Sequence, residues 1–339
     1  MTAPAVELAP ETRGGPRVSG AGSIVATEDR VAIADDLRTS VALEIAGVAA
    51  TPPSDIYVGW VAALEAAGCP ARYRAAGGDG GWGFPGWSPN LAGASVGRAA
   101  LARHVELAGD GPLHPLEAVR GWVRDMARSP TSPVGSWVAD LARAGDRAEL
   151  AATAASATRW IGGFARMTGW PLPERLALVT DEGGPFGRRW PKRWRPGRGA
   201  EVCVASSPDA VVGRVSAAGH FDLLVHRPMS PSDEAVADRA AFEAAAGTLS
   251  CGIAFDEVVV ATADTGERQR FRVDPNLLAR GVELIVAVVR QRVLAQDDWD
   301  FTDATPSPAC RHCPARADCP AGQTWLSGPG RWRGGLPTV

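Results

Sequence analysis

The sequence predicts an α/β or α+β fold with a small central sheet. Apolar residues recur at helical spacing through much of the first half of the chain. Segments of alternating polarity then appear at 201–206 and 211–225, as is typical of strands, and the segments 257–263 and 268–273 are expected to form a hairpin. A last apolar-striped helix at 276–296 precedes a cysteine-rich segment. This order of helices, strands, helix, hairpin and helix favours a sheet covered by helices.

The first half is expected to be mainly helical, and its expected boundaries rest on proline, glycine and capping residues. Ser54 follows two prolines and is a suitable N-cap, and Gly68 is a suitable helix end. We expect a disordered tail at 1–22, followed by two helical patterns within 23–68, the second of them over 54–67. A Gly- and Trp-rich loop is expected at 75–94. Helices are then expected over 95–169, with breaks at 109–115 and 129–133.

The second half is expected to hold the sheet. A helix at 232–249 separates the first strands from a hairpin that turns at 264–266. The whole is expected to form one domain over 23–325, between tails at 1–22 and 326–339. Its parts are a helical region at 54–170, a sheet core at 200–300 and a cysteine cluster at 305–322.

Composition is ordinary for a soluble globular protein, because 45% of the 339 residues are hydrophobic and 22% are charged. The net charge of -3 excludes a global basic field, so any contact with nucleic acid needs a local patch. The six cysteines, with no apolar leader and no run of 18 apolar residues, predict a cytoplasmic, reducing setting without a membrane segment. Cys203 and Cys251 are expected to be small buried hydrophobes.

Four cysteines predict a metal centre. Cys310, Cys313 and Cys319 form a C-x2-C-x5-C run, and Cys69 lies far upstream. Two thiolates three positions apart can bind one centre from a single turn, and the other two complete a four-ligand shell. A [4Fe-4S] cluster is the favoured occupant. Zinc is the alternative, with His312 as a possible replacement for Cys69, and unpaired thiols without metal are the third interpretation.

A local basic patch lies at 188–198, where six cations and two tryptophans fall within eleven residues. Cations neutralise phosphates and indole rings stack on unpaired bases. A solvated loop paired with acidic neighbours is the competing interpretation. The residues expected to bind nucleic acid are Arg188, Arg189, Trp190, Lys192, Arg193, Trp194, Arg195 and Arg198.

Several motifs occur in an order that suggests a family. They are Cys69-Pro70 followed by Arg72 and Tyr73, a helix with His104, the Gly219-x-x-Asp222 motif, a helix, a hairpin, a further helix and the cysteine trio. In this order the chain resembles the iron–sulfur branch of the PD-(D/E)XK nuclease superfamily, which includes RecB-type nucleases, Cas4 and the AddB nuclease domain. The resemblance covers roughly residues 54–322.

The resemblance implies a small mixed sheet of the restriction-endonuclease-like type, flanked by helices. It also implies a helical N-terminal part and an iron–sulfur segment at the C-terminus. By the same resemblance, Asp222 would bind Mg²⁺ or Mn²⁺ and His104 would lie in the catalytic site.

The chain departs from this family at the catalytic strand. Active members place an acidic residue, one residue and then a lysine on the strand after Gly-x-x-Asp, and no Glu-x-Lys occurs anywhere in this sequence. Lys192 is the single lysine, and Arg239 and Glu243 stand near the position of the family's Gln and Tyr. We therefore expect the catalytic strand to be eroded or deleted, with Asp222 and His104 vestigial.

The function expected from this combination is a catalytically inactive DNA-binding subunit. It would bind single-stranded DNA or DNA ends beside a helicase or nuclease partner, in DNA repair or phage defence. One alternative is an active metal-dependent exonuclease with relocated residues, namely Asp222 with Asp209 or Glu201, and Lys192 or Arg227 in place of the lysine. Another is a protein–protein scaffold that does not bind DNA.

Overall fold

The chain folds into helices and two small mixed sheets. The computed structural model describes residues 27–48, 56–77, 89–172, 176–180, 187–189, 193–196, 202–206, 208–212, 222–227, 233–262, 267–294, 300–306, 310, 313 and 315–328. Within them, no helix is long and apolar enough to span a membrane.

The helices follow one another in two groups, separated by most of the strands. They are α1 (Thr27–Val48), α2 (Trp60–Gly68), α3 (Pro70–Gly77), α4 (Pro89–Ala108), α5 (Pro115–Arg128), α6 (Pro133–Ala144), α7 (Arg147–Thr168), α8 (Asp233–Cys251), α9 (Pro275–Leu294) and α10 (Pro320–Ser327). The strands are β1 (Ile56–Val58), β2 (Leu176–Thr180), β3 (Gly187–Arg189), β4 (Arg193–Trp194), β5 (Val202–Ala205), β6 (Ala210–Val212), β7 (Asp222–Arg227), β8 (Glu257–Thr262) and β9 (Arg268–Arg272).

The larger sheet has six strands in the order β3-β2-β6-β7-β8-β9. Strand β6 pairs antiparallel with both β2 and β7. Helix α8 then connects β7 to β8, which lies parallel to it with Asp222 opposite Glu257. Strand β9 returns antiparallel to β8 as a hairpin. The smaller sheet has the order β1-β5-β4, with β1 parallel to β5.

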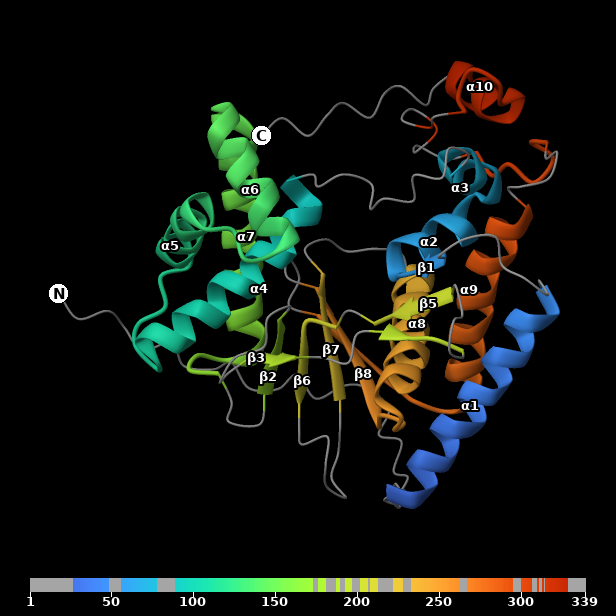
Figure 1. Cartoon of the computed structure of the whole chain (residues 1–339), viewed down its shortest axis with the longest axis horizontal. Coiled ribbons are helices and arrows are strands. Elements are labelled where there is room, and N and C mark those ends of the chain that lie inside the picture. Colours follow the sequence, from blue (N-terminus) through green and yellow to red (C-terminus); the bar gives the residue numbers. More distant parts are fainter. Residues whose placement is uncertain are drawn as a thin grey trace.

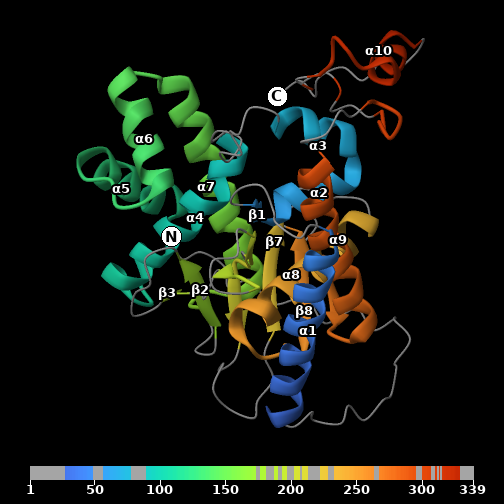
Figure 2. The same ribbon diagram turned by 45° about the vertical axis from the view of Figure 1, so that its right-hand side comes forward.

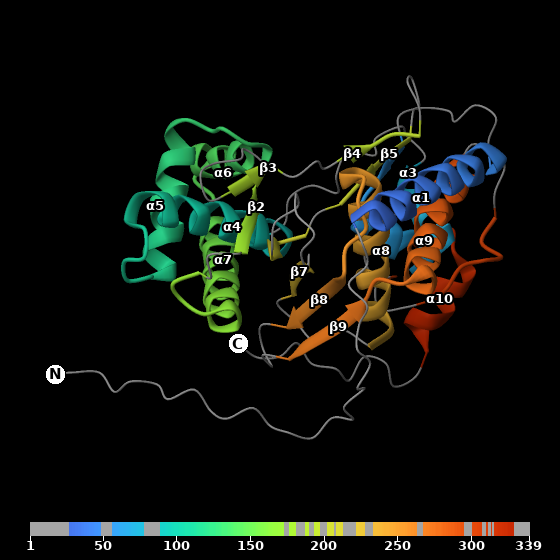
Figure 3. The ribbon, with the colours of Figure 1, turned by 90° about the horizontal axis from the view of Figure 1, so that it is seen from below.

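Helices cover both faces of the larger sheet, and β8 shows why. Val258 and Val260 point into one core with residues of α8 and α9. Val259 and Ala261 point into a second core with residues of α4 and α7. Because successive side chains of a strand face opposite sides, the buried valines of β8 place a core on each face. Figures 1 and 3 show α4–α7 on one side of the sheet and α8, α9 and α1 on the other.

The expected α/β character is confirmed at this coarse level. The expected helices at 232–249 and 276–296 correspond to α8 and α9, and the expected hairpin corresponds to β8 and β9. Helix breaks also fall near the expected places, between α4 and α5 and between α5 and α6. The expected tail at 1–22 lies outside the described residues. The expected tail at 326–339 begins later than predicted, because α10 continues through Ser327.

Three expectations about elements differ from the structure. The segment 54–67 is not one helix, because β1 occupies Ile56–Val58 and α2 begins at Trp60. The expected loop at 75–94 is shorter, since α3 extends to Gly77 and α4 begins at Pro89. Within the expected strand region 211–225, the described residues form the ends of two strands, β6 and β7, and 213–221 lie outside the described residues.

Candidate metal centre

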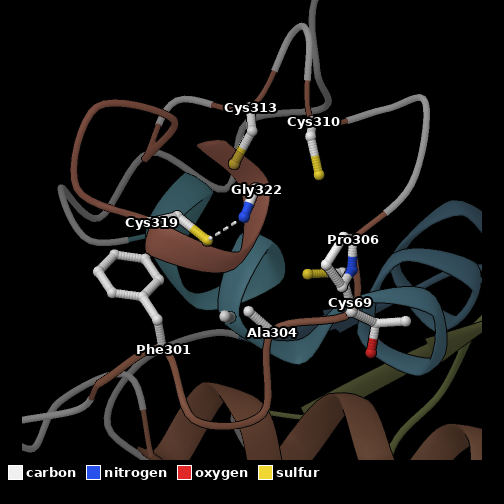
Figure 4. Close-up of a pocket in the computed structure, with 10 residues that line it drawn as sticks. Cys69, Phe301, Ala304, Pro306, Cys310, Cys313, Cys319 and Gly322 are labelled. Atoms are coloured by element: carbon white, nitrogen blue, oxygen red, sulfur yellow. Dashed lines mark hydrogen bonds between the residues drawn. The ribbon is translucent and has the colours of Figure 1, made fainter. Parts of the chain in front are cut away.

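Four cysteines from three parts of the chain line one pocket. Cys69 lies between α2 and α3, Cys310 and Cys313 lie in the connection after α9, and Cys319 precedes α10. Figure 4 shows their side chains around the same space. The remaining lining residues are mostly apolar, namely Ala71, Phe301, Ala304, Thr305, Pro306 and Gly322. The structure thus brings Cys69 to the same pocket as the C-terminal trio. Figure 2 shows α3 beneath the α10 region at one end of the molecule.

Cys69 is fixed at the junction of two short helices. Gly68 is the last residue of α2 and Pro70 is the first of α3. The Cys69 carbonyl accepts the backbone N–H of Tyr73 at 3.0 Å, which closes the first turn of α3. Pro70 suits this position because a helix needs no N–H donor at its start. Cys69 itself is buried, so its thiol faces the pocket from a rigid corner.

Cys319 is the N-cap of α10. Its Sγ accepts the backbone N–H of Gly322 at 3.3 Å, and its carbonyl accepts the N–H of Gln323 at 3.0 Å. Helix N-termini favour negative charge, because their N–H groups and the helix dipole point at the capping group. The thiolate is the form of cysteine that binds metal. Cys319 therefore holds its sulfur at the start of α10, facing the pocket.

Gly322 leaves room between two of the sulfurs. A Cβ added at Gly322 would lie 3.4 Å from Cys319 Sγ and 3.6 Å from Cys310 Sγ. The two sulfurs therefore face one small space that the absent side chain leaves open. Backbone turns hold the other members of the trio, since Cys313 N donates to Cys310 O at 3.3 Å and Arg316 N donates to Cys313 O at 3.1 Å.

The spacing of the thiols bears on which metal they fit. Among the residues that the structure describes, no group of three or more His, Cys, Asp or Glu side chains is close enough for a single metal ion. A tetrahedral zinc ion at ~2.3 Å from each sulfur would hold its sulfurs about 3.8 Å apart. A four-iron cluster needs the same four thiolates but spreads them more widely. The metal that these thiols would bind therefore stays a prediction, and His312 lies outside the described residues.

The predicted catalytic residues lie outside this pocket. Asp222 is the first residue of β7, placed by its backbone between Val212 and Glu257. His104 lies on α4, with its ring 5.6 Å from that of Trp170. Burial and the nearby charge of His114 lower the pKa of His104. Strand β7, which begins at Asp222, lies inside the larger sheet, and the next described element of the chain is α8.

The residues that an active exonuclease would use beside Asp222 are either placed in other structural roles or outside the described residues. Asp209 is buried and accepts a bond from Arg98 Nη1 at 2.7 Å, which joins α4 to the start of β6. Arg227 is placed on β7 by its backbone. Glu201 and Lys192 lie outside the described residues. Asp209 is therefore committed to a structural ion pair.

The basic segment 188–198 is divided between the two sheets. Arg188 and Arg189 belong to β3 of the larger sheet, whereas Arg193 and Trp194 belong to β4 of the smaller one. Trp194 is partly buried against the core of α8 and α9, which argues against the predicted base-stacking role for its ring. Arg195 is exposed. Trp190, Lys192 and Arg198 lie outside the described residues.

The structure contains a buried polar network around Glu243 that was not predicted from the sequence. Glu243 of α8 is fully buried, pairs with Arg239 Nη2 at 2.8 Å and accepts a bond from Ser206 Oγ at 2.7 Å. The Arg239 guanidinium lies 5.1 Å from the centre of the Trp60 ring, and burial lowers its pKa. The i,i+4 spacing of Arg239 and Glu243 was visible in the sequence, but their burial was not. This network joins α8 to β5 and α2.

Comparison with known proteins adds no relative. No family model matches the chain, and a search of curated proteins finds no significant match. Motif order and spacing remain the basis of the family resemblance.

Proposed function

We propose that this chain is a nucleic-acid-binding protein of the iron–sulfur nuclease type that does not cleave its substrate. The observation that carries the proposal is the convergence of Cys69 with Cys310, Cys313 and Cys319 on one pocket. The mixed sheet with helices on both faces agrees with the expected class of fold. Binding of single-stranded DNA or DNA ends, and action beside a helicase or nuclease in the cytoplasm, follow from the resemblance.

The four cysteines would hold a [4Fe-4S] cluster whose role is architectural. When bound, such a cluster supplies bonds that join distant parts of a chain. Cys69 belongs to the α2–α3 corner, and the other three ligands belong to the segment around α10. The chain supplies a backbone N–H that donates to Cys319 Sγ at the start of α10 and an apolar wall that includes Phe301 and Ala304. Apolar surroundings of this kind limit access of water to the ligands.

Absence of cleavage is proposed from the residues available. Metal-dependent cleavage needs a divalent ion held by more than one carboxylate, with a lysine or equivalent group to orient water. Asp209 is already paired with Arg98. Glu257, opposite Asp222 across β7 and β8, is bonded to Arg270 at 2.8 Å. Asp209 and Glu257 are thus both paired with arginines.

The metal proposal is tested by anaerobic purification of the chain, followed by analysis of iron, sulfide, zinc and visible absorbance. We expect about four iron atoms and about as many sulfides per chain. Cys69→Ser should lose iron, whereas Cys203→Ser should keep it, because Cys203 is buried in β5 away from the pocket. A colourless, sulfide-free protein with one zinc would contradict the cluster.

The nucleic-acid proposal is tested with a labelled single-stranded oligonucleotide in the presence of Mn²⁺. We expect binding at low salt without cleavage. Cleavage that disappears in Asp222→Ala would identify an active nuclease and contradict the proposed inactivity. Absence of binding at low salt would instead favour the scaffold interpretation.

A further inference from the structure

Helix α5 presents a row of three arginines to solvent. Arg120, Arg124 and Arg128 are all exposed and follow one another at intervals of four residues. Four residues of α-helix rise ~6 Å, so the row extends about 12 Å along one face. The opposite face is buried in the lobe formed by α4–α7, through Ala118, Val119, Trp122 and Met126. Figure 1 shows α5 at the outer side of this lobe, away from α10.

Among the described residues, the arginines of this row have no ion-pair partner, although the exposed Glu117 lies three residues before Arg120 on the same helix. Within the described part of the chain, none of the three arginines forms an ion pair or side-chain hydrogen bond. Asp125, the acid that interrupts the row in sequence, is engaged by Arg103 of α4. Other exposed arginines do have acidic partners, as Arg280 has Asp238 at 2.8 Å. The α5 row is therefore a local source of positive potential in a chain of net charge -3.

The helix holds the row in a fixed geometry. Met126 packs against Gly135 of α6 so closely that a Cβ at Gly135 would lie 2.6 Å from its sulfur. Trp122 is buried in the same core. This packing holds the backbone of α5 in place, so the three arginines project from one helical row. A rigid row of cations suits a partner whose negative charges also repeat along a line.

The surroundings of the row favour nucleic acid over protein. Specific protein interfaces depend on a desolvated core rich in aromatic and apolar side chains. On α5, which is described throughout, Leu116 is the single large exposed apolar residue. Phosphate contacts need no such core, because they are made by cations along the backbone of the strand.

We propose that Arg120, Arg124 and Arg128 bind the phosphate backbone of a nucleic acid strand along α5. This inference rests on the proposed nucleic-acid-binding function and assigns to it a surface separate from residues 188–198. Because guanidinium–phosphate contacts carry no base information, the row sets the path and affinity of the strand and not its sequence preference.

The test is the salt dependence of binding to a labelled DNA duplex with a single-stranded end. The double variant Arg124→Gln/Arg128→Gln removes two charges and keeps side chains of good helix propensity. Arg272→Gln/Arg290→Gln is the matched control, since both arginines are exposed on β9 and α9, away from α5. We expect the α5 variant to bind about tenfold more weakly at low salt, with a slope of log K against log salt smaller by about two. The control should match the unmodified chain.

The possible outcomes distinguish failure of the α5 surface from failure of the proposed nucleic-acid-binding function. If the unmodified chain does not bind the oligonucleotide, the proposed function and the α5 surface both fail. If it binds and the α5 variant behaves like the control, only the surface is wrong. Polyglutamate is added as a competitor at equal charge concentration. Competition equal to that of unlabelled DNA would identify a surface for acidic polypeptides and overturn the assignment to nucleic acid.

Discussion

Arg74 and Asp303 are 229 residues apart in sequence and form a two-bonded ion pair beside the cysteine pocket. Nη1 of Arg74 donates to Oδ2 at 2.8 Å and Nη2 donates to Oδ1 at 2.5 Å. Nη1 also donates to Oε1 of Gln291 in α9 at 2.5 Å. Arg74 belongs to α3, directly after Cys69, and Asp303 belongs to the 301–306 wall of the pocket. Protein contacts alone therefore hold two sides of the pocket together.

Arg74→Ala is expected to lower both stability and metal content. The guanidinium is almost fully buried, and its removal leaves Asp303 and Gln291 without their charged donor. Because the Asp303 side chain is 40% exposed, we expect a loss of about 2–3 kcal/mol in the free energy of unfolding, below that of a fully buried pair. Urea denaturation measures this loss. Iron per chain should also fall, because the wall of the pocket is no longer fixed to α3.

A matched variant separates positioning from general stability. Arg30 is as deeply buried and pairs with Asp256 at 2.6 Å, joining α1 to the segment before β8. Arg30→Ala should cost similar stability while the iron content stays unchanged. Arg74→Lys should recover part of the iron, since it keeps the charge but not the two-bonded geometry. Equal loss of iron in Arg30→Ala and Arg74→Ala would contradict a positioning role for Arg74.

Gly322→Ala is expected to lower metal content without lowering stability of the metal-free chain. The added methyl group would lie 3.4–3.6 Å from two sulfurs, which is ordinary contact. It would, however, occupy space between Cys310 and Cys319 that a cluster needs. Iron analysis should show a reduced content, and urea denaturation of the metal-free protein should be unchanged within about 0.5 kcal/mol. Gly328→Ala at the other end of α10 is the control and should keep its iron, because its φ of -63° suits alanine.

The elements that sequence predicted correctly are those with a local signal. Helix α9 has a continuous apolar stripe, and the β8–β9 hairpin combines a valine-rich run, an alternating run and turn residues between them in the sequence. Strand β1 lacks such a signal, because Ile56 and Val58 also fit the apolar spacing of a helix. Their strand conformation depends on pairing with β5, where Ile56 lies opposite Val202. Such a pairing between distant segments leaves no mark on the local pattern.

In the candidate metal centre, too, the features with a local sequence pattern were predicted and those that depend on distant contacts were not. The spacing of Cys310, Cys313 and Cys319 was visible in the sequence, and Cys69 was expected to complete the four-ligand shell from far upstream. Arg74 gave no signal, because one arginine among so many is not distinctive until its burial and partners are known. Trp194 gave a misleading signal, since a tryptophan between cations suggests stacking on bases but packs partly against a core here.

Gly281→Ala is expected to be strongly destabilising. Helices α8 and α9 pack so closely at this point that a Cβ would lie 2.2 Å from the carbonyl oxygen of Ala241 and 2.6 Å from Cβ of Ala245. The first of these atoms belongs to the backbone and cannot move without moving α8. We expect a loss of about 3 kcal/mol or more in the free energy of unfolding, measured by urea denaturation. Gly47→Ala in α1 should be neutral or slightly stabilising, because nothing lies within 4 Å of its added Cβ. Similar values for the two variants would contradict close packing of α8 on α9.

Stability is expected to fall as pH decreases below neutrality, and His104 is expected to contribute. Burial, followed by the charge of His114, lowers its pKa in the folded chain, and among the described residues its Nε2 has no hydrogen-bond partner. The unfolded chain therefore binds the proton more readily, so the contribution is fully present above the unfolded pKa of about 6.5 and is lost as pH falls below it. His104→Gln should show a smaller fall in melting temperature between pH 7.5 and 5.5 than the unmodified chain. His114→Gln should show an intermediate fall, because it removes the repelling charge but leaves His104 buried. An unchanged fall in His104→Gln would assign the pH dependence to other groups.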